Sequence, residues 1–348
     1  MKRNHRMMAG FASILLVLAL LAGCSQGSTG SVTTTAPADS STAAPATTSD
    51  AQAVIDSTDP IEFICCFDPG GGHDTMLRSM EKAIRANNLL ENPIIYTYKP
   101  GGNQAVGMAY TNQQKGRKDC IMSTTISLVT VEHQTDIGMS YRNLTPICMW
   151  GTTAQFLFVK GDRAWKSLDD MLKSGERLTF TSSGVGSDEE ITTARLKEFS
   201  GADIQSIPTG SDAESLTQVL GGHIDVLVSE LGGLEDYVKS GELKILACTG
   251  EDRSVYMPDI PTLRELGYDH NNCGFRGIMG PPDMPADAVA YYVDLFKKVF
   301  DTKEFKDYMT ANGVEPKFLS GDEFKAYLDD TETKMLENFK LVGIQIIQ

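Results

Sequence analysis

Four short loops of the sequence are rich in Gly, Ser and Thr, and each comes just before a helical pattern. They cover residues 69–74, 123–127, 182–187 and 209–212. The first turn of a helix leaves several backbone N–H groups unpaired and carries the positive end of the helix dipole. Glycine lets the backbone approach an anion closely, and Ser and Thr hydroxyls add hydrogen-bond donors. Four such loops around one cleft would bind a carboxylate without needing an arginine.

Each loop taken alone also has a simpler interpretation, because Ser, Thr and Asp are ordinary helix caps. The coincidence of four loops, two in each half of the folded part, favours a binding site. The predicted ligand-binding residues are Phe67, Pro69, Gly71, Gly72, His73, Asp74, Ser123, Thr124, Thr125, Ser183, Gly184, Gly186, Ser187, Thr209, Gly210, Asp225 and Ser229.

Two ionisable side chains of the first loop bear on the kind of anion that would bind. His73 is either a donor to a ligand carboxylate or an ordinary solvent-exposed loop histidine. A negative Asp68 would disfavour highly charged tricarboxylates, and a positively charged His73 would offset that effect.

The common sequence signatures of catalysis and nucleotide binding are missing from the chain. The Gly-x-Gly of residues 184–186 follows a predicted strand, but Glu189 takes the third glycine position of a dinucleotide-binding fingerprint. The sequence contains neither a Gly-x-x-x-x-Gly-Lys-Ser/Thr phosphate loop nor a Gly-x-Ser-x-Gly nucleophile elbow. Adjacent acids such as Asp169 and Asp170 do not face each other on a helix. We therefore predict no catalytic residue and no cofactor.

Six cysteines follow Cys24, and none has the spacing of a metal site. We expect free, buried thiols and no bound metal. Two disulfides stay open as alternatives from the sequence, Cys120–Cys148 and Cys248–Cys273.

Short β-branched segments alternate with helical patterns from residue 61 onward, which predicts an α/β fold with parallel sheets. Crossovers near residues 158–161 and 274–280 would divide it into two α/β domains. Domain 1 would comprise residues 59–159 and 275–348, and domain 2 residues 160–274. We expect the ligand in the cleft between them, at the carboxyl ends of the strands. The expected strands are 61–67, 93–98, 119–123, 154–160, 177–181, 204–207, 224–229, 243–248 and 275–280.

The first 58 residues have the pattern of an export signal followed by a tether. Three basic residues precede an apolar segment, 11–21, which is too short to span a bilayer. The sequence Leu21-Ala22-Gly23-Cys24 fits a lipoprotein cleavage site, so we predict a signal peptide at 1–23 and lipidation of Cys24; the alternative is an ordinary signal peptide. Residues 24–58 are rich in Ser, Thr and Ala, which predicts a disordered tether.

The whole chain carries a formal charge of −15. So acidic a protein is poorly suited to bind nucleic acid or an anionic lipid surface. We therefore expect no nucleic-acid partner, and an anion site has to be created locally.

Several motifs together resemble the substrate-binding component of tripartite tricarboxylate transporters, the Bug family, and the likeness runs from Ile61 to the C-terminus. Residues 67–74 are similar to the family's Pro-Gly-Gly-x-x-Asp loop, with His73 in place of a small hydroxyl residue. Thr209 stands where the family often has Tyr-Lys-Gly. The other matching segments are Lys99-Pro100-Gly101-Gly102-Asn103, residues 184–187, residues 220–225, and Arg253 followed by residues 258–267.

This resemblance implies a type II periplasmic-binding-protein fold that closes about a hinge on its ligand. It implies a small organic carboxylate as ligand, such as a dicarboxylate, a tricarboxylate or an aromatic acid, held by backbone groups, hydroxyls and ordered water. It also implies a membrane partner with one large and one small subunit. We therefore expect a monomeric, lipid-anchored receptor on the extracytoplasmic face of the cell membrane that is not an enzyme.

Two other functions remain open from the sequence. One is a solute sensor that passes its closed state to a signalling partner. The other is an anchored hydrolase or transferase, for which no nucleophile–base–orienter set is visible.

Overall fold

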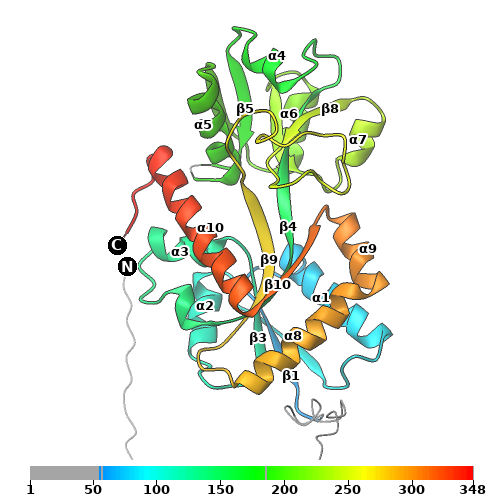
Figure 1. Cartoon of the computed structure of the whole chain (residues 1–348), viewed down its shortest axis with the longest axis vertical. Helices are drawn as coiled ribbons and strands as arrows, with labels where there is room; N and C mark the ends of the chain where they lie inside the picture. Colours follow the sequence, from blue (N-terminus) through cyan, green and yellow to red (C-terminus); the bar gives the residue numbers. More distant parts are fainter. Residues whose placement is uncertain (1–54, 56–57, 185, 348) are drawn as a thin grey trace, which may run out of the picture. The chain divides into compact units, whose positions relative to one another are not determined.

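The computed structural model describes residues 55, 58–184 and 186–347 (Figure 1). The predicted signal peptide, Cys24 and most of the predicted tether lie outside this part of the chain. None of the helices in the described part combines the length and the apolar character needed to cross a membrane.

Strands and helices alternate along the chain, so the predicted α/β class is confirmed. The strands are β1 Ile61–Cys65, β2 Ile94–Tyr98, β3 Cys120–Thr124, β4 Thr145–Lys160, β5 Leu178–Ser182, β6 Ile204–Pro208, β7 Val226–Glu230, β8 Leu243–Cys248, β9 Cys273–Gly280 and β10 Glu315–Ser320. The helices are α1 Gly72–Ala86, α2 Ala105–Asn112, α3 Ser127–Gln134, α4 Leu168–Leu172, α5 Asp188–Ser200, α6 Asp212–Leu220, α7 Glu235–Lys239, α8 Ala286–Asp301, α9 Lys303–Ala311 and α10 Gly321–Leu341.

The strands form one sheet of order β2-β1-β3-β9-β4-β7-β5-β6, and β8 and β10 also pair with β4. We call β2, β1, β3, β9, β10 and the start of β4 the first sheet half. The end of β4 with β7, β8, β5 and β6 is the second sheet half. Within each half the βα units are parallel, and β9, β10, β7 and β8 run antiparallel to β4.

Strand β4 is much longer than the predicted 154–160 and serves both sheet halves. Its residues 145–154 pair with β9, and residues 155–160 pair with β7 and β8. Figure 1 shows β4 and β9 side by side along the line that connects the two halves. The predicted domain limits fall at the end of β4 and within β9, whereas β4 changes its pairing partners between residues 154 and 155. The division into domains stays a prediction.

Each sheet half has its own apolar core. In the first half, Phe63 of β1 and Met80 of α1 pack in the same cluster as Tyr292 of α8. In the second half, Phe180 of β5 packs in a cluster with Leu196 of α5. All five residues of β1 are buried, as expected for a central parallel strand covered on both faces.

Helix α10 joins the two halves a second time. Met335 and Phe339 of α10 form a small apolar cluster with Ile191 of α5. The Arg195 side chain of α5 donates a hydrogen bond to the Asn338 side chain of α10, with a donor–acceptor distance of 3.0 Å.

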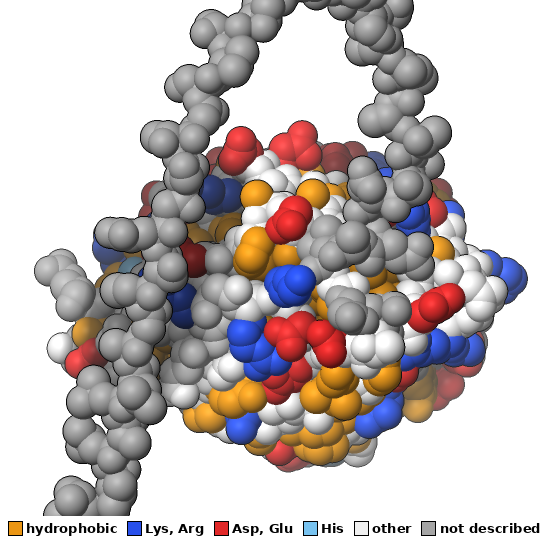
Figure 2. All heavy atoms as spheres, turned by 90° about the horizontal axis from the view of Figure 1, so that it is seen from below, with side chains coloured by type: hydrophobic (Ala, Val, Ile, Leu, Met, Phe, Trp, Pro, Cys, Tyr) orange, Lys and Arg blue, Asp and Glu red, His pale blue; other side chains and the backbone are white. Residues whose placement is uncertain are grey.

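On the face in Figure 2, acidic and basic side chains are interspersed, so the net negative charge does not form a single acidic patch there.

Candidate functional site

His73 lies at the start of α1 and contacts both the first loop and the end of β3. Its Nδ1 is 3.2 Å from the Ser123 hydroxyl, and its ring lies 4.3 Å from the Phe67 ring, centroid to centroid. The side chain is 8% exposed, and burial together with the nearby positive charge of Arg276 lowers its pKa to about 3. His73 is therefore a neutral hydrogen-bonding group, and the positive charge considered for it from the sequence does not fit this burial.

Asp74 holds the first loop in place. Its carboxylate accepts hydrogen bonds from the Gly70 N–H at 2.8 Å and the Tyr98 hydroxyl at 2.7 Å, and it pairs with Arg78 at 2.9 Å. Burial opposes ionisation, but these contacts lower the pKa of Asp74 below its usual value. An occupied anionic group positions the loop and is not itself suited to contact a carboxylate.

The helix that follows the first loop starts without a side-chain cap. Gly71 is the N-cap residue of α1 and offers no side-chain acceptor to the first N–H groups. Pro69, Gly71 and Gly72 lie in the exposed part of this loop. Within the described residues, no side chain caps this helix N-terminus, so it keeps the donors that the anion-site prediction requires.

Thr124 and Thr125 end β3 and are fixed by the buried side chain of Gln104. The Gln104 amide donates to the Thr124 hydroxyl at 2.8 Å and accepts from the Thr125 N–H at 3.4 Å. The Thr125 hydroxyl accepts a hydrogen bond from Arg276 at 3.1 Å. The structure thus brings Ser123, Thr124 and Thr125 together with His73 and with a cation.

The loops of the second sheet half use their donors on their own acidic residues. The Gly186 N–H donates to the Glu190 carboxylate at 2.6 Å, and the Gly210 N–H donates to Glu214 at 2.8 Å. The Ser183 hydroxyl donates to Glu189 at 2.9 Å. These contacts show that the loops can bind a carboxylate, but an external ligand would have to displace one already present.

The remaining hydroxyls of these loops have structural partners. Ser187 caps α5 by accepting from the Glu190 N–H, which is the simpler interpretation considered for it from the sequence. Thr209 shares a 2.5 Å hydrogen bond with Ser215. Gly184 donates its N–H to the Ser182 hydroxyl at 3.0 Å.

Asp225 and Ser229 lie at opposite ends of β7. Asp225 precedes the strand, where it accepts from the Thr179 N–H and hydroxyl and pairs with Arg163. Thr179 is near the amino end of β5, so the structure does not bring Asp225 together with the loop at the other end of that strand. Ser229 is next to Glu230, at the carboxyl end that the site prediction requires.

Arg276 is the functional candidate that the sequence reasoning missed. It lies on β9, donates to the Thr125 hydroxyl at 3.1 Å, and contacts the Glu230 carboxylate at 3.4 Å. Its side chain is 21% exposed. It therefore connects the end of β3 in the first sheet half with the end of β7 in the second. A lone arginine in the apolar segment Phe275-Arg276-Gly277-Ile278 was the available signal.

A buried hydroxyl lies beside Arg276. Thr153 of β4 pairs with Gly274 of β9, so their side-chain directions share a face of the sheet. A Cβ on Gly274 would stand 2.7 Å from the Thr153 Oγ1 and 3.8 Å from an Arg276 guanidinium nitrogen. Thr153 is 2% exposed, and its hydroxyl has no hydrogen-bond partner within the described residues. We call Arg276, Thr153, Thr125 and Glu230 the Arg276 site.

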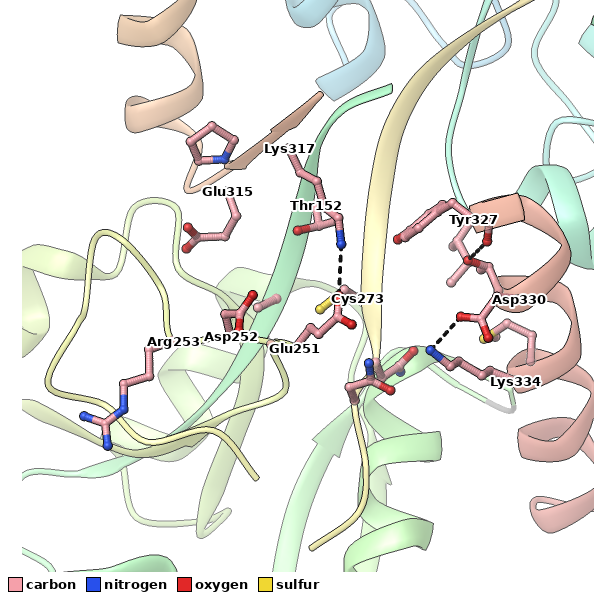
Figure 3. Close-up of a pocket in the computed structure, with 18 of the residues that line it drawn as sticks. Thr152, Glu251, Asp252, Arg253, Cys273, Glu315, Lys317, Tyr327, Asp330 and Lys334 are labelled. Carbon is pink, nitrogen blue, oxygen red and sulfur yellow. Dashed lines mark hydrogen bonds and ion pairs between the residues drawn. The ribbon is translucent and has the colours of Figure 1, made fainter. Parts of the chain in front are cut away.

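A cavity of about 420 Å³ lies elsewhere on the strands that connect the halves (Figure 3). Thr152 and Ala154 line it, and they alternate with Thr153 along β4, so it belongs to the other face of the strand. Its cations already have acidic partners: Lys317 pairs with Glu251 at 2.9 Å, and Lys334 with Asp330 at 2.7 Å. None of the predicted ligand-binding residues lines this cavity, and the Arg276 site remains the better candidate for an anion.

One cluster in the described residues brings together three groups that could ligate a metal, Glu132, His133 and Glu332. Arg142 donates to both oxygens of Glu332, at 3.0 and 2.6 Å. A guanidinium in this position satisfies the carboxylate and repels a cation, so the cluster is better described as an ion-pair network.

Comparisons with known proteins concern the family and the fold of the chain. A family model described as "Tripartite tricarboxylate transporter family receptor" matches residues 76–343. A UPF0065 protein from Cupriavidus necator is 24% identical over 290 residues, which cover 82% of this chain and 88% of that protein. Protein BugT from Bordetella pertussis is 23% identical over 286 residues, which cover 78% and 85%.

Solved structures show the same fold. A TctC solute-binding protein from Polaromonas superposes with a TM-score of 0.72 at 22% identity, covering 81% of this chain and 98% of that one. A malate-bound protein named MatC from Rhodopseudomonas palustris gives a TM-score of 0.59 at 16% identity, covering 82% and 99%. An adipate-bound protein from R. palustris gives 0.65 at 17%, covering 83% and 98%. The predicted periplasmic-binding-protein fold is confirmed.

Proposed function

Because the chain belongs to the receptor family of tripartite tricarboxylate transporters, we propose that it is an extracytoplasmic solute receptor for a small organic carboxylate. The malate and adipate in two structures of the same fold support this ligand class. In this proposal the receptor delivers its ligand to one large and one small membrane subunit. A lipid on Cys24 and the 24–58 tether would keep the monomer at the membrane surface.

The observation that carries the proposal is the position of Arg276. It is a mostly buried cation in a chain of formal charge −15, and it contacts residues of both sheet halves. A guanidinium offers five N–H donors in a planar fork that fits a carboxylate. A ligand whose carboxylate binds Arg276 next to Thr125 would also lie near the neutral His73 side chain and the uncapped N-terminus of α1.

Binding at this point would also couple to hinge closure. Thr125 and Glu230 belong to different sheet halves, and Arg276 lies on one of the strands that connect them. If residues 59–159 with 275–348 and residues 160–274 move as two domains, a ligand held by Arg276 would draw the two sets of loops together. The receptor would then present a closed form to its membrane partner.

The alternative of a hydrolase has one apparent support, the pair formed by His73 and Ser123. Ser123 is fully buried, so a substrate carbonyl cannot reach its hydroxyl. The low pKa of His73 makes its imidazole a weak base, and its ring packs on Phe67. A nucleophile needs an accessible hydroxyl and an oriented base, so the pair favours ligand binding over catalysis.

Thermal unfolding of the chain from residue 25 onward tests the proposal. The panel contains mono-, di- and tricarboxylates, sugars and inorganic phosphate. A ligand that binds only the folded state adds about 2.7 kcal/mol of stability at a concentration of about 100 Kd. We expect the midpoint to rise with one class of carboxylate.

The variant Arg276→Gln should lower affinity for that carboxylate by on the order of tenfold or more, because it removes a charged hydrogen bond. Arg264→Gln is the matched control, since it loses the same charge from an ion pair with Asp269 outside the Arg276 site. A midpoint shift with a sugar or phosphate but with no carboxylate would overturn the ligand class. Unchanged affinity in Arg276→Gln would overturn the site.

A further inference from the structure

The Arg276 site contains one acidic residue of the second sheet half, Glu230, and a second one, Asp188, lies close enough to interact electrostatically with Arg276 and Glu230. Glu230 ends β7 and lies 3.4 Å from the Arg276 guanidinium. Asp188 is the first residue of α5 and is partly exposed. Burial and the neighbouring Glu189 raise the pKa of Asp188 to about 6, and Glu230 contributes in the same direction. Asn272 and Arg276 oppose that increase. The cation of the site is therefore outnumbered by acids.

This charge balance does not suit a ligand that carries only carboxylates. The contact with Glu230 already offsets the charge of Arg276. Each further negative group would approach Asp188 as well as Glu230, and like charges at short range repel one another. A ligand that brings its own positive charge would turn the same acids into partners.

The donors for one carboxylate are nevertheless present. Arg276 has five N–H groups, and the contacts to Thr125 and Glu230 leave some of them open. The Thr153 side chain is 2% exposed, and its hydroxyl has no hydrogen-bond partner within the described residues. This hydroxyl and an Arg276 guanidinium nitrogen both lie within 4 Å of the position that a Cβ on Gly274 would take. A buried hydroxyl without a partner is costly, and a ligand oxygen would satisfy it. This is an observation independent of the acids.

We propose that the ligand is a carboxylate that also carries an ammonium group, with Arg276 and Thr153 holding the carboxylate and Asp188 and Glu230 holding the ammonium. The inference rests on the proposed function and narrows its ligand class. An ammonium suits this arrangement better than a metal ion. Among the described residues, neither Asp188 nor Glu230 belongs to a cluster of three potential metal ligands whose ligand atoms lie within 4.8 Å of one another.

Calorimetric titration of the chain from residue 25 onward with pairs of ligands that differ only in the amino group tests the inference. The pairs are succinate with aspartate, glutarate with glutamate, and butyrate with 4-aminobutyrate. In at least one pair the amino compound should bind on the order of tenfold tighter or more, because hydrogen bonds between charged groups are the strong ones.

Two variants identify the residues responsible. Asp188→Asn and Glu230→Gln should reduce the preference for the amino compound toward unity. The control Glu198→Gln removes the same charge from the far end of α5, where Glu198 pairs with Arg195, and it should keep the preference. Retention of the preference in both Asp188→Asn and Glu230→Gln would overturn the assignment.

The pH dependence provides a second readout. An ammonium ligand needs the ionised form of Asp188, so its affinity should fall as the pH decreases through about 6. A plain dicarboxylate should show the opposite trend, because protonation of Asp188 removes a repulsive charge. Asp188→Asn should abolish both trends.

The outcomes separate this inference from the proposed function. Binding of the plain carboxylates as tight as that of their amino partners would overturn the inference and leave the receptor proposal standing. If no carboxylate of the three pairs or of the wider panel binds, and a sugar or phosphate does bind, both the inference and the receptor proposal are overturned.

Discussion

The substitution Gly274→Ala should destabilise the protein by forcing Thr153 out of its place. The new Cβ would stand 2.7 Å from the Thr153 Oγ1, whereas ordinary contacts of a Cβ begin at 3.4 Å. The overlap is roughly 0.7 Å, and overpacking of this kind costs about 1–3 kcal/mol. Thr153 is 2% exposed, so its side chain has little room to move away.

A double-mutant cycle isolates the clash. Thr153→Ala removes the hydroxyl, and since that group has no partner in the described residues, no hydrogen bond is lost. In the Thr153→Ala background, Gly274→Ala should therefore cost far less, with a coupling energy of about 1 kcal/mol or more. Thr153→Ser keeps the hydroxyl and should give no such relief.

Urea unfolding of the single and double variants measures these free energies. Gly72→Ala is the control, because a Cβ there has no neighbour within 4 Å. The reasoning is refuted if Gly274→Ala is as stable as the parent chain, or if Thr153→Ala and Thr153→Ser relieve the cost equally.

Two further predictions concern other ionisable groups. The hydrogen bond from Arg142 lowers the pKa of Glu332 below its usual value of 4.5, although burial acts in the opposite direction. Ionised Glu332 therefore stabilises the folded state above pH 4.5, and this stabilisation is lost as the pH falls through the folded-state pKa. Urea unfolding between pH 3 and 6 should show a smaller acid loss in Glu332→Gln, and equal losses would contradict the pairing. The six cysteine thiols of the described part are free, and five are buried. In the native chain these thiols should not react with a thiol reagent, except for slow reaction at Cys273, because burial raises the pKa of that thiol to about 12. Rapid labelling of several thiols in the native chain would contradict their burial.

The order of strands and helices could be predicted from the sequence because the alternation of short apolar segments and helical patterns is a local signal. Strand β10, Glu315–Ser320, escaped that reasoning because it contains Pro316 and is only partly buried. The first part of β4 was missed as well. It pairs with strands that lie far away in the sequence, so its length depends on long-range contacts.

The binding loops were located from the sequence, but their hydrogen bonds could not be assigned. Whether Gly186 offers its N–H to a ligand depends on the rotamer of Glu190, four residues later. The loop at Ser187 has the same composition as an anion site and as a helix cap, and only geometry distinguishes them.

Arg276 could not be placed in the site from the sequence alone. It is 151 residues from Thr125 and 46 from Glu230 along the chain. The antiparallel pairing of β9 with β3 and β4 brings these residues together. A sequence pattern reports on neighbours along the chain, whereas this contact is created by the register of the sheet.

Strand β4 has one further consequence, which concerns cooperativity. Its sixteen residues form a single hydrogen-bonded segment whose two ends belong to different halves of the sheet. Loss of either half would strip the partners from one end of this strand and expose apolar residues such as Trp150 or Phe158, both at most 1% exposed. We therefore expect the two halves to share one unfolding transition, even though each has its own core. In the proposed closure, the strand about which the halves move would also prevent them from unfolding independently.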